Sequence, residues 1–335
     1  MIRKILTVLL CSIMVITTAS CGANAPAESA ASGSSDAAAP APTQSDEKVL
    51  VGISTSNGSS SYQVRMLAST TAEIEKRGGE YILVDAALDP AKQISDVEDL
   101  LQRNIDVLII EAVDSSAFLP AIELTKAKGV PVIVQNVFPT DEILEKVNGI
   151  TYPDVYQAGY ELGKEIFTQM GGEGQVFAYH YSLVEVTIIQ GQGFLDAAKE
   201  FPNIDIVKDE DGDPASEAAM RVAESWLQQY PEVGGVYTFN DSSSYGFAAA
   251  IEAADRTGKT LLGFPGGGEK EDWENLRDGV LAAFAVGPTT QLGVIAVDLA
   301  YKAIEAGVDT FVGEEKAPYV VVTAKDAEEG LKQFS

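Results

Sequence analysis

Histidine and cysteine are scarce in this chain of 335 residues, which contains one histidine and two cysteines. A cluster of histidines that binds a metal is therefore excluded, and no Cys–His nucleophile pair can be assembled. Cys11 lies inside an N-terminal apolar run, so Cys21 is the single cysteine that remains if this run is removed. No internal disulfide can then form. We expect no metal and no cofactor.

Basic residues are few, with 23 lysines and arginines against 50 aspartates and glutamates. The formal net charge is −27 at pH 7, and the isoelectric point is about 4.2. A surface this acidic repels phosphate backbones and anionic lipid head groups. Binding to nucleic acid is therefore excluded.

One long apolar run stands at the N-terminus, from Ile5 to Ala19, after the basic residues Arg3 and Lys4. The run is too short to favour a membrane-spanning helix, which needs about 20 apolar residues. A basic start, an apolar stretch and small residues after it are typical of a secretory signal. We interpret residues 1–20 as a signal peptide.

The segment from Thr18 to Gly22, TASCG, resembles a bacterial lipobox, although Thr18 stands where leucine is usual. This resemblance implies lipidation of Cys21 after cleavage and an extracytoplasmic protein held on a membrane by its acyl chains. The alternative is a free thiol in an ordinary tail. Residues 22–48 are rich in Ala, Ser, Pro and Gly, so we interpret 21–48 as the lipidated cysteine and a disordered tether.

Beyond the tether, apolar runs typical of strands alternate with segments of helical spacing. The runs VLVGIS, YILVDA, DVLIIE and VPVIVQ begin at residues 49, 81, 106 and 130, and Asp89-Pro90 is a helix start signal. Near-continuous apolar strands in β-α-β-α order predict a parallel, doubly wound α/β sheet. The pattern starts again beyond Ile150, so we expect two such units in tandem.

Polar and aromatic side chains follow the ends of the predicted strands. In open parallel sheets, ligands bind beyond the carboxyl ends of the strands, so these side chains should converge on one cleft. Gln135 and Asn136 are the clearest example, because two neutral amides directly follow a buried strand. We interpret them as ligand contacts.

The chain from Val49 to Ser335 resembles the ribose/galactose type (type 1) of periplasmic substrate-binding protein that serves ABC importers. The resemblance is carried, in order, by VLVGISTSN, DPAKQISDVEDLLQRNIDVLIIEAVDSSA, AKGVPVIVQN, GQGF, VYTFNDSSSYGFAAAIEAADRTGK and LLGFPG. It implies two doubly wound lobes joined by three crossings that close on a small ligand. The implied lobes are 49–150 plus 288–318 and 151–287 plus 319–335. The resemblance also implies that the protein is a monomer, that it delivers its ligand to a membrane permease, and that it catalyses no reaction.

Charged positions of the family's sugar binders are replaced in this chain. Asn136-Val137 stands for an Asp-Arg pair, Gln190 for an arginine, and Pro265 for an aspartate, while Asn240 is kept. Charged side chains bind sugar hydroxyls strongly. Their loss predicts a neutral, amide-lined pocket with aromatic walls.

The predicted ligand is small and neutral. A sugar or sugar derivative is the main expectation, and a nucleoside or another non-sugar ligand is the alternative. A second alternative is that an alignment shift of one residue brings other charges into the pocket. The residues expected to contact the ligand are Ser54, Asn57, Tyr62, Glu111, Gln135, Asn136, Phe138, Tyr181, Gln190, Asn240 and Pro265.

Three other features have ordinary structural alternatives. His180 is either a pocket-wall residue or a solvent-facing loop histidine. The acidic run Asp209–Asp213 has its glycine misplaced for a calcium loop, so a solvated turn is favoured. The glycines of FPGGGEK at 264–270 are followed by acidic residues, which favours a flexible turn over a phosphate site.

Three function classes are compatible with these features. A transport binding protein accounts for the signal, lipid site, tether and two lobes together. A sensory binding protein that reports to a membrane receptor would have the same sequence features. An enzyme would need titratable groups that converge at the strand ends, where amides and hydroxyls are found instead.

Overall fold

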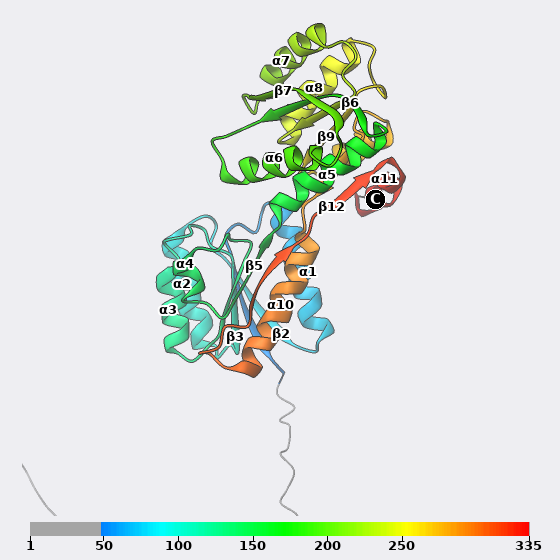
Figure 1. The fold of residues 1–335 in the computed structure, drawn as a ribbon. Coiled ribbons are helices and arrows are strands. Elements are labelled where there is room, and N and C mark those ends of the chain that lie inside the picture. The colour runs from blue at the N-terminus through cyan, green and yellow to red at the C-terminus, as the bar shows by residue number, and fades with distance from the viewer. Residues whose placement is uncertain (1–47, 335) are drawn as a thin grey trace, which may run out of the picture. The chain divides into compact units, whose positions relative to one another are not determined.

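The structure, a computed structural model, describes residues 48–334, and Figure 1 labels its helices and strands. The predicted signal peptide, Cys21 and the tether up to residue 47 lie outside the described residues. Residues 48–334 form two six-stranded sheets with helices around them. The predicted α/β class with two largely parallel sheets is confirmed. None of the helices that the structure describes is both long enough and apolar enough to cross a membrane.

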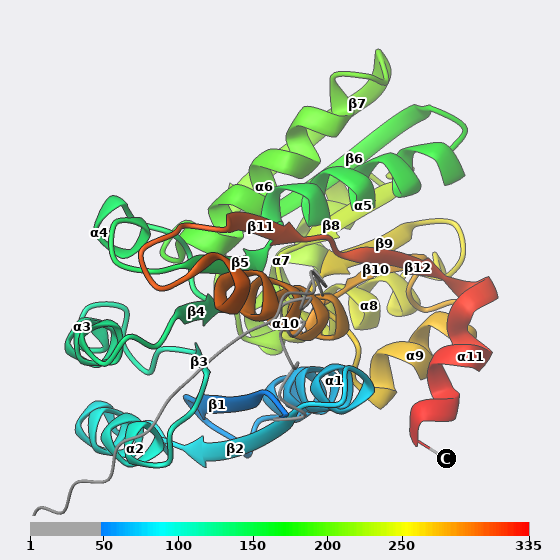
Figure 2. The same cartoon turned by 90° about the horizontal axis from the view of Figure 1, so that it is seen from below.

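The first sheet is parallel throughout, in the order β11-β5-β4-β3-β1-β2. Its strands are β1 (Leu50–Thr55), β2 (Glu80–Asp85), β3 (Val107–Ile110), β4 (Val132–Gln135), β5 (Gly149–Pro153) and β11 (Gly313–Ala317). Its helices are α1 (Ser61–Lys76), α2 (Pro90–Gln102), α3 (Leu119–Ala127), α4 (Asp141–Leu144) and α10 (Thr289–Ala306). Helices α2 and α3 cover one face, and α1 and α10 cover the other (Figure 2).

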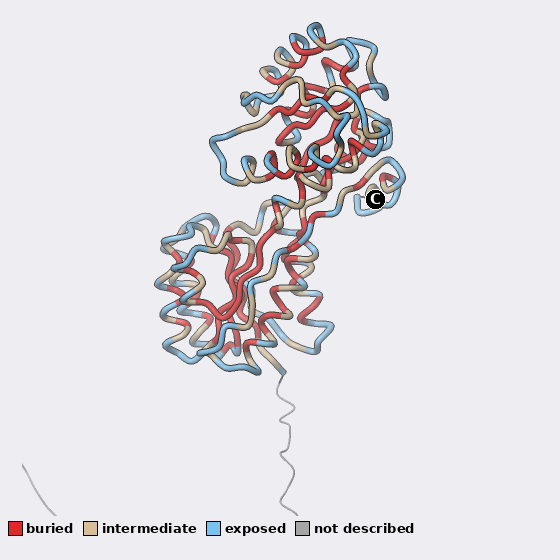
Figure 3. The backbone as a smooth tube through the Cα atoms, viewed as in Figure 1, coloured by how far each residue is buried: buried red, intermediate tan, exposed pale blue. Residues whose placement is uncertain are grey.

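The central strands of this sheet are buried on both faces, as their apolar runs predict (Figure 3). Because side chains alternate along a strand, neighbouring residues of β4 enter different cores. Ile133 packs with Ala296 and Val297 of α10, whereas Val132 and Val134 pack in the core below α2 and α3. The same alternation determines to which face of the sheet each polar side chain near a strand end points.

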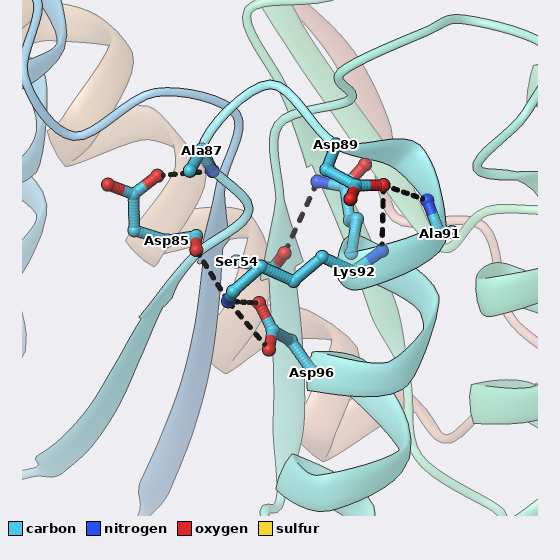
Figure 4. Close-up of polar contacts among 8 residues, drawn as sticks. Ser54, Asp85, Ala87, Asp89, Ala91, Lys92 and Asp96 are labelled. Atoms are coloured by element: carbon cyan, nitrogen blue, oxygen red, sulfur yellow. Dashed lines mark hydrogen bonds and ion pairs between the residues drawn. The ribbon is translucent and has the colours of Figure 1, made fainter.

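The start of helix α2 confirms the sequence signal Asp89-Pro90. The Asp89 carboxylate accepts hydrogen bonds from the backbone N–H groups of Ala91, at 2.9 Å, and Lys92, at 3.1 Å. Figure 4 shows these bonds at the first turn. Pro90 has no N–H to leave unpaired and its φ already suits a helix. Capping and proline therefore fix where the chain leaves β2 and enters α2.

The second sheet has the order β12-β10-β9-β8-β6-β7, in which β12 is antiparallel to β10 and the other pairs are parallel. Its strands are β6 (Glu173–His180), β7 (Asn203–Asp211), β8 (Gly235–Thr238), β9 (Leu261–Pro265), β10 (Ala283–Val286) and β12 (Val320–Thr323). Its helices are α5 (Val155–Gln169), α6 (Glu185–Ala198), α7 (Ser216–Gln229), α8 (Asp241–Ala253), α9 (Lys270–Arg277) and α11 (Ala327–Leu331).

The chain passes between the two sheets three times: after β5, after β10 and after β11. The first and third passages are joined by a hydrogen bond from the Asp154 N–H to the Ala317 carbonyl, at 2.8 Å. Nearby, the Tyr319 N–H donates to Gln157 Oε1 at 3.0 Å. One backbone–backbone and one backbone–side-chain hydrogen bond thus hold these two passages beside each other.

Helices α5 and α6 approach each other closely at two glycines. A Cβ atom at Gly159 would lie 1.8 Å from the carbonyl oxygen of Gln190. A Cβ atom at Gly193 would lie 2.2 Å from the carbonyl oxygen of Tyr156. The two backbones are therefore in direct contact. Of the G-x-G sequence, Gly193 is part of this packing, whereas Gly191 lies against the His180 ring.

The acidic run differs from its prediction. The sequence favoured a solvated turn over Asp209–Asp213, but β7 continues to Asp211, which pairs with His180 of β6. Strand β7 lies at the edge of the sheet, beside β6 alone. Its backbone can therefore pair on one side while the acidic side chains reach solvent.

Candidate functional site

Three polar residues follow three neighbouring strands of the first sheet: Ser56 after β1, Glu111 after β3 and Asn136 after β4. Strand β3 lies between the other two, so Glu111 is central. The strand pairing continues one residue further at two of these positions. The Glu111 N–H donates to the Ser54 carbonyl at 2.9 Å, and the Asn136 N–H donates to the Thr151 carbonyl at 2.8 Å. These backbone hydrogen bonds thus fix the positions of Glu111 and Asn136 beyond the strand ends.

Four polar side chains donate hydrogen bonds to the Glu111 carboxylate. Glu111 is buried, with 6% of the residue exposed. One oxygen, Oε1, accepts from Asn136 Nδ2 at 2.7 Å and also from Gln63 Nε2. The other, Oε2, accepts from Ser56 Oγ at 3.0 Å and Thr55 Oγ1 at 3.3 Å. The four side-chain donors are uncharged, as is the Ser56 N–H, which donates to Oε2 at 3.5 Å. Within residues 48–334, hydrogen bonds therefore stabilise this buried negative charge without a cation.

Asn136 has a left-handed backbone conformation, with φ of 57°. Asparagine enters this region more readily than most residues, and such conformations cluster at binding sites. The Tyr62 hydroxyl donates to Asn136 Oδ1 at 3.4 Å. Burial raises the pKa of Tyr62 well above its ordinary value, and Tyr319 and Glu111 raise this pKa further. Tyr62 therefore stays protonated and acts as a donor.

Two predicted contacts in the first sheet point into the helix layers. Ser54 Oγ accepts from Gln93 Nε2 of α2 at 3.2 Å, and Figure 4 shows Ser54 beside that helix. Gln135 Nε2 lies 3.4 Å from Thr70 Oγ1 of α1. Both side chains are buried. The alternation along the strands explains this placement, because the residues one position later, Thr55 and Asn136, reach Glu111 instead.

Asn57 and Phe138 lie in the loops after β1 and β4. Asn57 Oδ1 accepts from the Ser59 N–H at 3.2 Å and from Ser59 Oγ at 2.7 Å, so Asn57 stabilises its own turn. The Phe138 ring packs on Tyr152, with 5.6 Å between the ring centroids. Their ligand contacts stay predictions.

In the second sheet, three predicted contacts have structural roles. Asn240 caps helix α8, because its Oδ1 accepts from the Ser243 N–H at 2.9 Å. Pro265 ends β9 and pairs with Ala285 of β10. Gln190 is buried in α6, where its carbonyl contacts α5. These roles leave their ligand contacts as predictions as well.

Tyr181 and His180 lie at the end of β6 beside a cavity of about 340 Å³. Tyr181 stacks on Phe239 with 5.2 Å between ring centroids and an interplanar angle of 14°. His180 Nε2 lies 2.8 Å from Asp209 Oδ1. The cavity is lined by His180, Tyr181, Ser182, Ile188, Gly191, Gln192, Leu195, Asp209 and Asp211. The His180 side chain is only 15% exposed and belongs to strand β6, which argues against a solvent-facing loop histidine, while its place in the wall of a ligand pocket stays a prediction.

We expect His180 to titrate below pH 6.5. Burial lowers its pKa from the ordinary value near 6.5, and Asp209 and Asp211 oppose this effect in part. The unfolded chain then binds the proton more readily, so stability falls as the pH drops below 6.5 toward the folded pKa. An NMR titration of the untagged protein reads this pKa directly, because the chain has one histidine. Asp209→Asn should lower it further, and a pKa above 6.5 in the unmodified protein would refute the prediction.

Sequence reasoning missed Gln63 and a contact between the helices of the two sheets. Gln63 follows Tyr62 in the first turn of α1, a helical position that the ends of the predicted strands do not mark. Glu269, which precedes α9, accepts from Ser61 Oγ at 2.8 Å and pairs with Arg65 at 3.3 Å. Partners separated by about two hundred residues leave no local pattern. Within residues 48–334, no group of three His, Cys, Asp or Glu side chains is placed to hold a metal.

Two α/β units, three chain passages between them and polar side chains beyond the strand ends define a two-part α/β binding protein. The chain belongs to the periplasmic binding protein domain family, whose model matches residues 51–307. Membership of this family confirms the prediction of a binding protein that is not an enzyme.

Known proteins with similar sequences and folds agree with this family. The ribose import binding protein RbsB of Bacillus subtilis is 29% identical over 265 residues, which are 78% of this chain and 83% of that protein. The solved structure of AraP, an arabinose binding protein from Geobacillus stearothermophilus, has a TM-score of 0.71 at 18% identity. That match covers 84% of this chain and 99% of AraP. A solute binding protein from Bacillus halodurans with bound myo-inositol has a TM-score of 0.62 at 22% identity, covering 87% and 100% of the two chains.

Proposed function

We propose that this protein captures a sugar or a sugar-like polyol and delivers it to an ABC import permease. The ligand lies between two lobes, 49–150 plus 288–318 and 151–287 plus 319–335, which close on it about the three chain passages. Closure follows because the ligand contacts both lobes only in the closed state. The protein acts as a monomer and performs no chemistry on its ligand.

The observation that carries this proposal is the cluster around Glu111. A buried carboxylate with amides and hydroxyls at the ends of three parallel strands is suited to the hydroxyl groups of a small polyol. Similar proteins are named for importing ribose and D-apiose, and solved structures of the same fold contain myo-inositol and D-allose. Together these observations favour a polyhydroxylated ligand over a nucleoside.

A thermal-shift screen of the purified protein tests this function. The probes are D-ribose, D-apiose, L-arabinose, D-allose and myo-inositol, with adenosine and L-leucine as ligands of other classes. At a hundred times its dissociation constant, a ligand adds about 2.7 kcal/mol to stability, which is easily measured. A shift with at least one polyol and none with adenosine or leucine supports the proposal. A shift with adenosine alone would contradict it.

We also propose that the protein is an extracytoplasmic lipoprotein anchored through Cys21, with residues 1–20 removed as a signal peptide. The apolar run, the small residues before Cys21 and the polar segment after it support this proposal.

Replacing Cys21 with serine should release the protein from the membrane, because a serine hydroxyl cannot take the thioether-linked lipid. The measurement is fractionation of cells that express each form, together with labelling by a radioactive fatty acid. Cys11→Ser is the matched control and should leave both the label and the membrane fraction unchanged. A Cys21→Ser protein that is still labelled would refute the anchor.

A further inference from the structure

Glu111 decides how two amide side chains are turned. Its Oε1 accepts from Asn136 Nδ2, at 2.7 Å, and from Gln63 Nε2. A carboxylate has no proton to donate, so each amide must direct its NH₂ group toward Glu111. The two carbonyl oxygens, Gln63 Oε1 and Asn136 Oδ1, are consequently turned away from Glu111.

Both of these oxygens can accept further hydrogen bonds. Gln63 is 9% exposed, and its Oε1 is buried without a donor from residues 48–334. Asn136 Oδ1 receives the Tyr62 hydroxyl at a long distance of 3.4 Å. An amide oxygen has two acceptor positions, and buried polar atoms are normally paired. An unpaired oxygen of this kind beside predicted ligand contacts indicates that a donor from the ligand belongs there.

The neighbouring hydroxyl groups direct their protons into the cluster. Ser56 Oγ and Thr55 Oγ1 donate to Glu111 Oε2, at 3.0 Å and 3.3 Å. Together with Tyr62, which donates to Asn136, these hydroxyl groups use their hydrogens within the cluster. The amide oxygens of Gln63 and Asn136 therefore remain as acceptors for a ligand, beside the second N–H of each amide.

Among the residues that the structure describes, none forms an ion pair with Glu111. Its four side-chain donors are neutral, and Arg65, on the same helix as Gln63, pairs with Glu269 instead. The formal charge of the whole chain is −27. A site of this kind attracts cations and repels anions.

We propose that Glu111 is a positioning residue that turns Gln63 and Asn136 so that both amide oxygens face the ligand. The site then recognises O–H and N–H donors. It accepts a neutral polyol or a polyol that carries a protonated amine, and it rejects the matching carboxylic acid. The ligand class rests on the proposed function, whereas the amide orientation does not.

The ligand class is tested by titration calorimetry with matched sugars that differ at one group. The probes are D-galactose, D-galactosamine and D-galacturonate, and the corresponding D-glucose series. For a parent sugar that binds, the amine should bind within threefold or more tightly, and the acid at least a hundredfold more weakly. An acid that binds as well as its amine would overturn the proposal.

Glu111→Gln tests the positioning role, because a glutamine amide can donate as well as accept and so allows the neighbouring amides to turn. The amine-to-acid affinity ratio should fall at least tenfold in this variant. Asp114→Asn is the matched control, since Asp114 lies in the same loop and its carboxylate bonds its own turn at Ser116 and Ala117. The control should keep the ratio within twofold, and a Glu111→Gln ratio equal to that of the unmodified protein would overturn the role.

Two further measurements separate this proposal from the proposed function. Side-chain NH₂ signals of Gln63 and Asn136 in ¹H–¹⁵N spectra, without ligand, should shift in Glu111→Gln and stay in place in Asp114→Asn. Such shifts without binding of any probe would support the positioning role while overturning the ligand class and the polyol function.

If Glu111→Gln does not fold, Gln63→Leu serves instead. This variant should bind the parent sugar about tenfold more weakly and should still reject the acid. Unchanged affinity in that variant would contradict the role of Gln63.

Discussion

Gly159→Ala should lower the free energy of unfolding by about 3 kcal/mol, the upper part of the usual range for an overpacked core. The added Cβ would lie 1.8 Å from the Gln190 carbonyl oxygen, which belongs to the backbone of α6 and cannot rotate away. The two helices would have to separate. Urea unfolding followed by circular dichroism measures this loss.

Gly163→Ala is the matched control, one turn further along α5. A Cβ atom there would lie 3.0 Å from Ala197 Cβ, 3.1 Å from Phe194 Cδ2 and 3.3 Å from the Phe194 carbonyl oxygen, so a relaxation of a few tenths of an ångström relieves these contacts. Alanine is also favoured over glycine inside a helix by about 1 kcal/mol. The control should therefore lie within about 1 kcal/mol of the unmodified protein. Equal stability of the two variants would show that α5 and α6 do not pack as described.

Glu111→Leu should weaken binding of the preferred sugar by about a hundredfold, which corresponds to about 2.8 kcal/mol. Leucine keeps a similar volume but leaves Gln63, Asn136, Ser56 and Thr55 without their common acceptor. Removing one partner from a buried hydrogen-bonded group leaves the others unsatisfied. These side chains would then turn toward other partners and lose the arrangement that the ligand requires. Titration calorimetry with the sugar that gives the largest thermal shift measures the loss.

For this prediction the control is Asp85→Asn, which removes a carboxylate near the end of β2. Asp85 Oδ1 accepts from the Ala87 N–H at 2.8 Å, and an asparagine carbonyl can keep that bond. The affinity of Asp85→Asn for the sugar should stay within about twofold of that of the unmodified protein, because salt screens the long-range effect of an exposed charge. Retention of full affinity by Glu111→Leu would remove Glu111 from the site.

Much of the fold could be predicted from local sequence. The apolar runs at β3 and β4 are continuous because both faces are covered, and Asp89-Pro90 fixes the start of α2. The prediction was wrong for the acidic run, which continues as strand β7 up to Asp211. An edge strand needs little apolar surface, so its sequence resembles that of a loop.

The candidate site was predictable only in part. Strand ends pointed to Glu111, Asn136 and Tyr62, which the structure brings together. Ser54 and Gln135 were placed in the same group, yet their side chains enter the helix layers. Along a strand, a shift of one residue moves a side chain to the opposite face, and strand ends read from sequence are uncertain by more than this.

By itself, the sequence determined which segments become parallel strands, where helices begin, and that polar groups gather at the carboxyl ends of the strands, because these properties depend on neighbours within a few residues. The tertiary structure decided which of those groups meet. Gln63 and Asn136 are separated by more than seventy residues, and both bond to Glu111 because β3 lies between β1 and β4. Strand order and side-chain direction are set by packing across the whole sheet, so no local pattern records them.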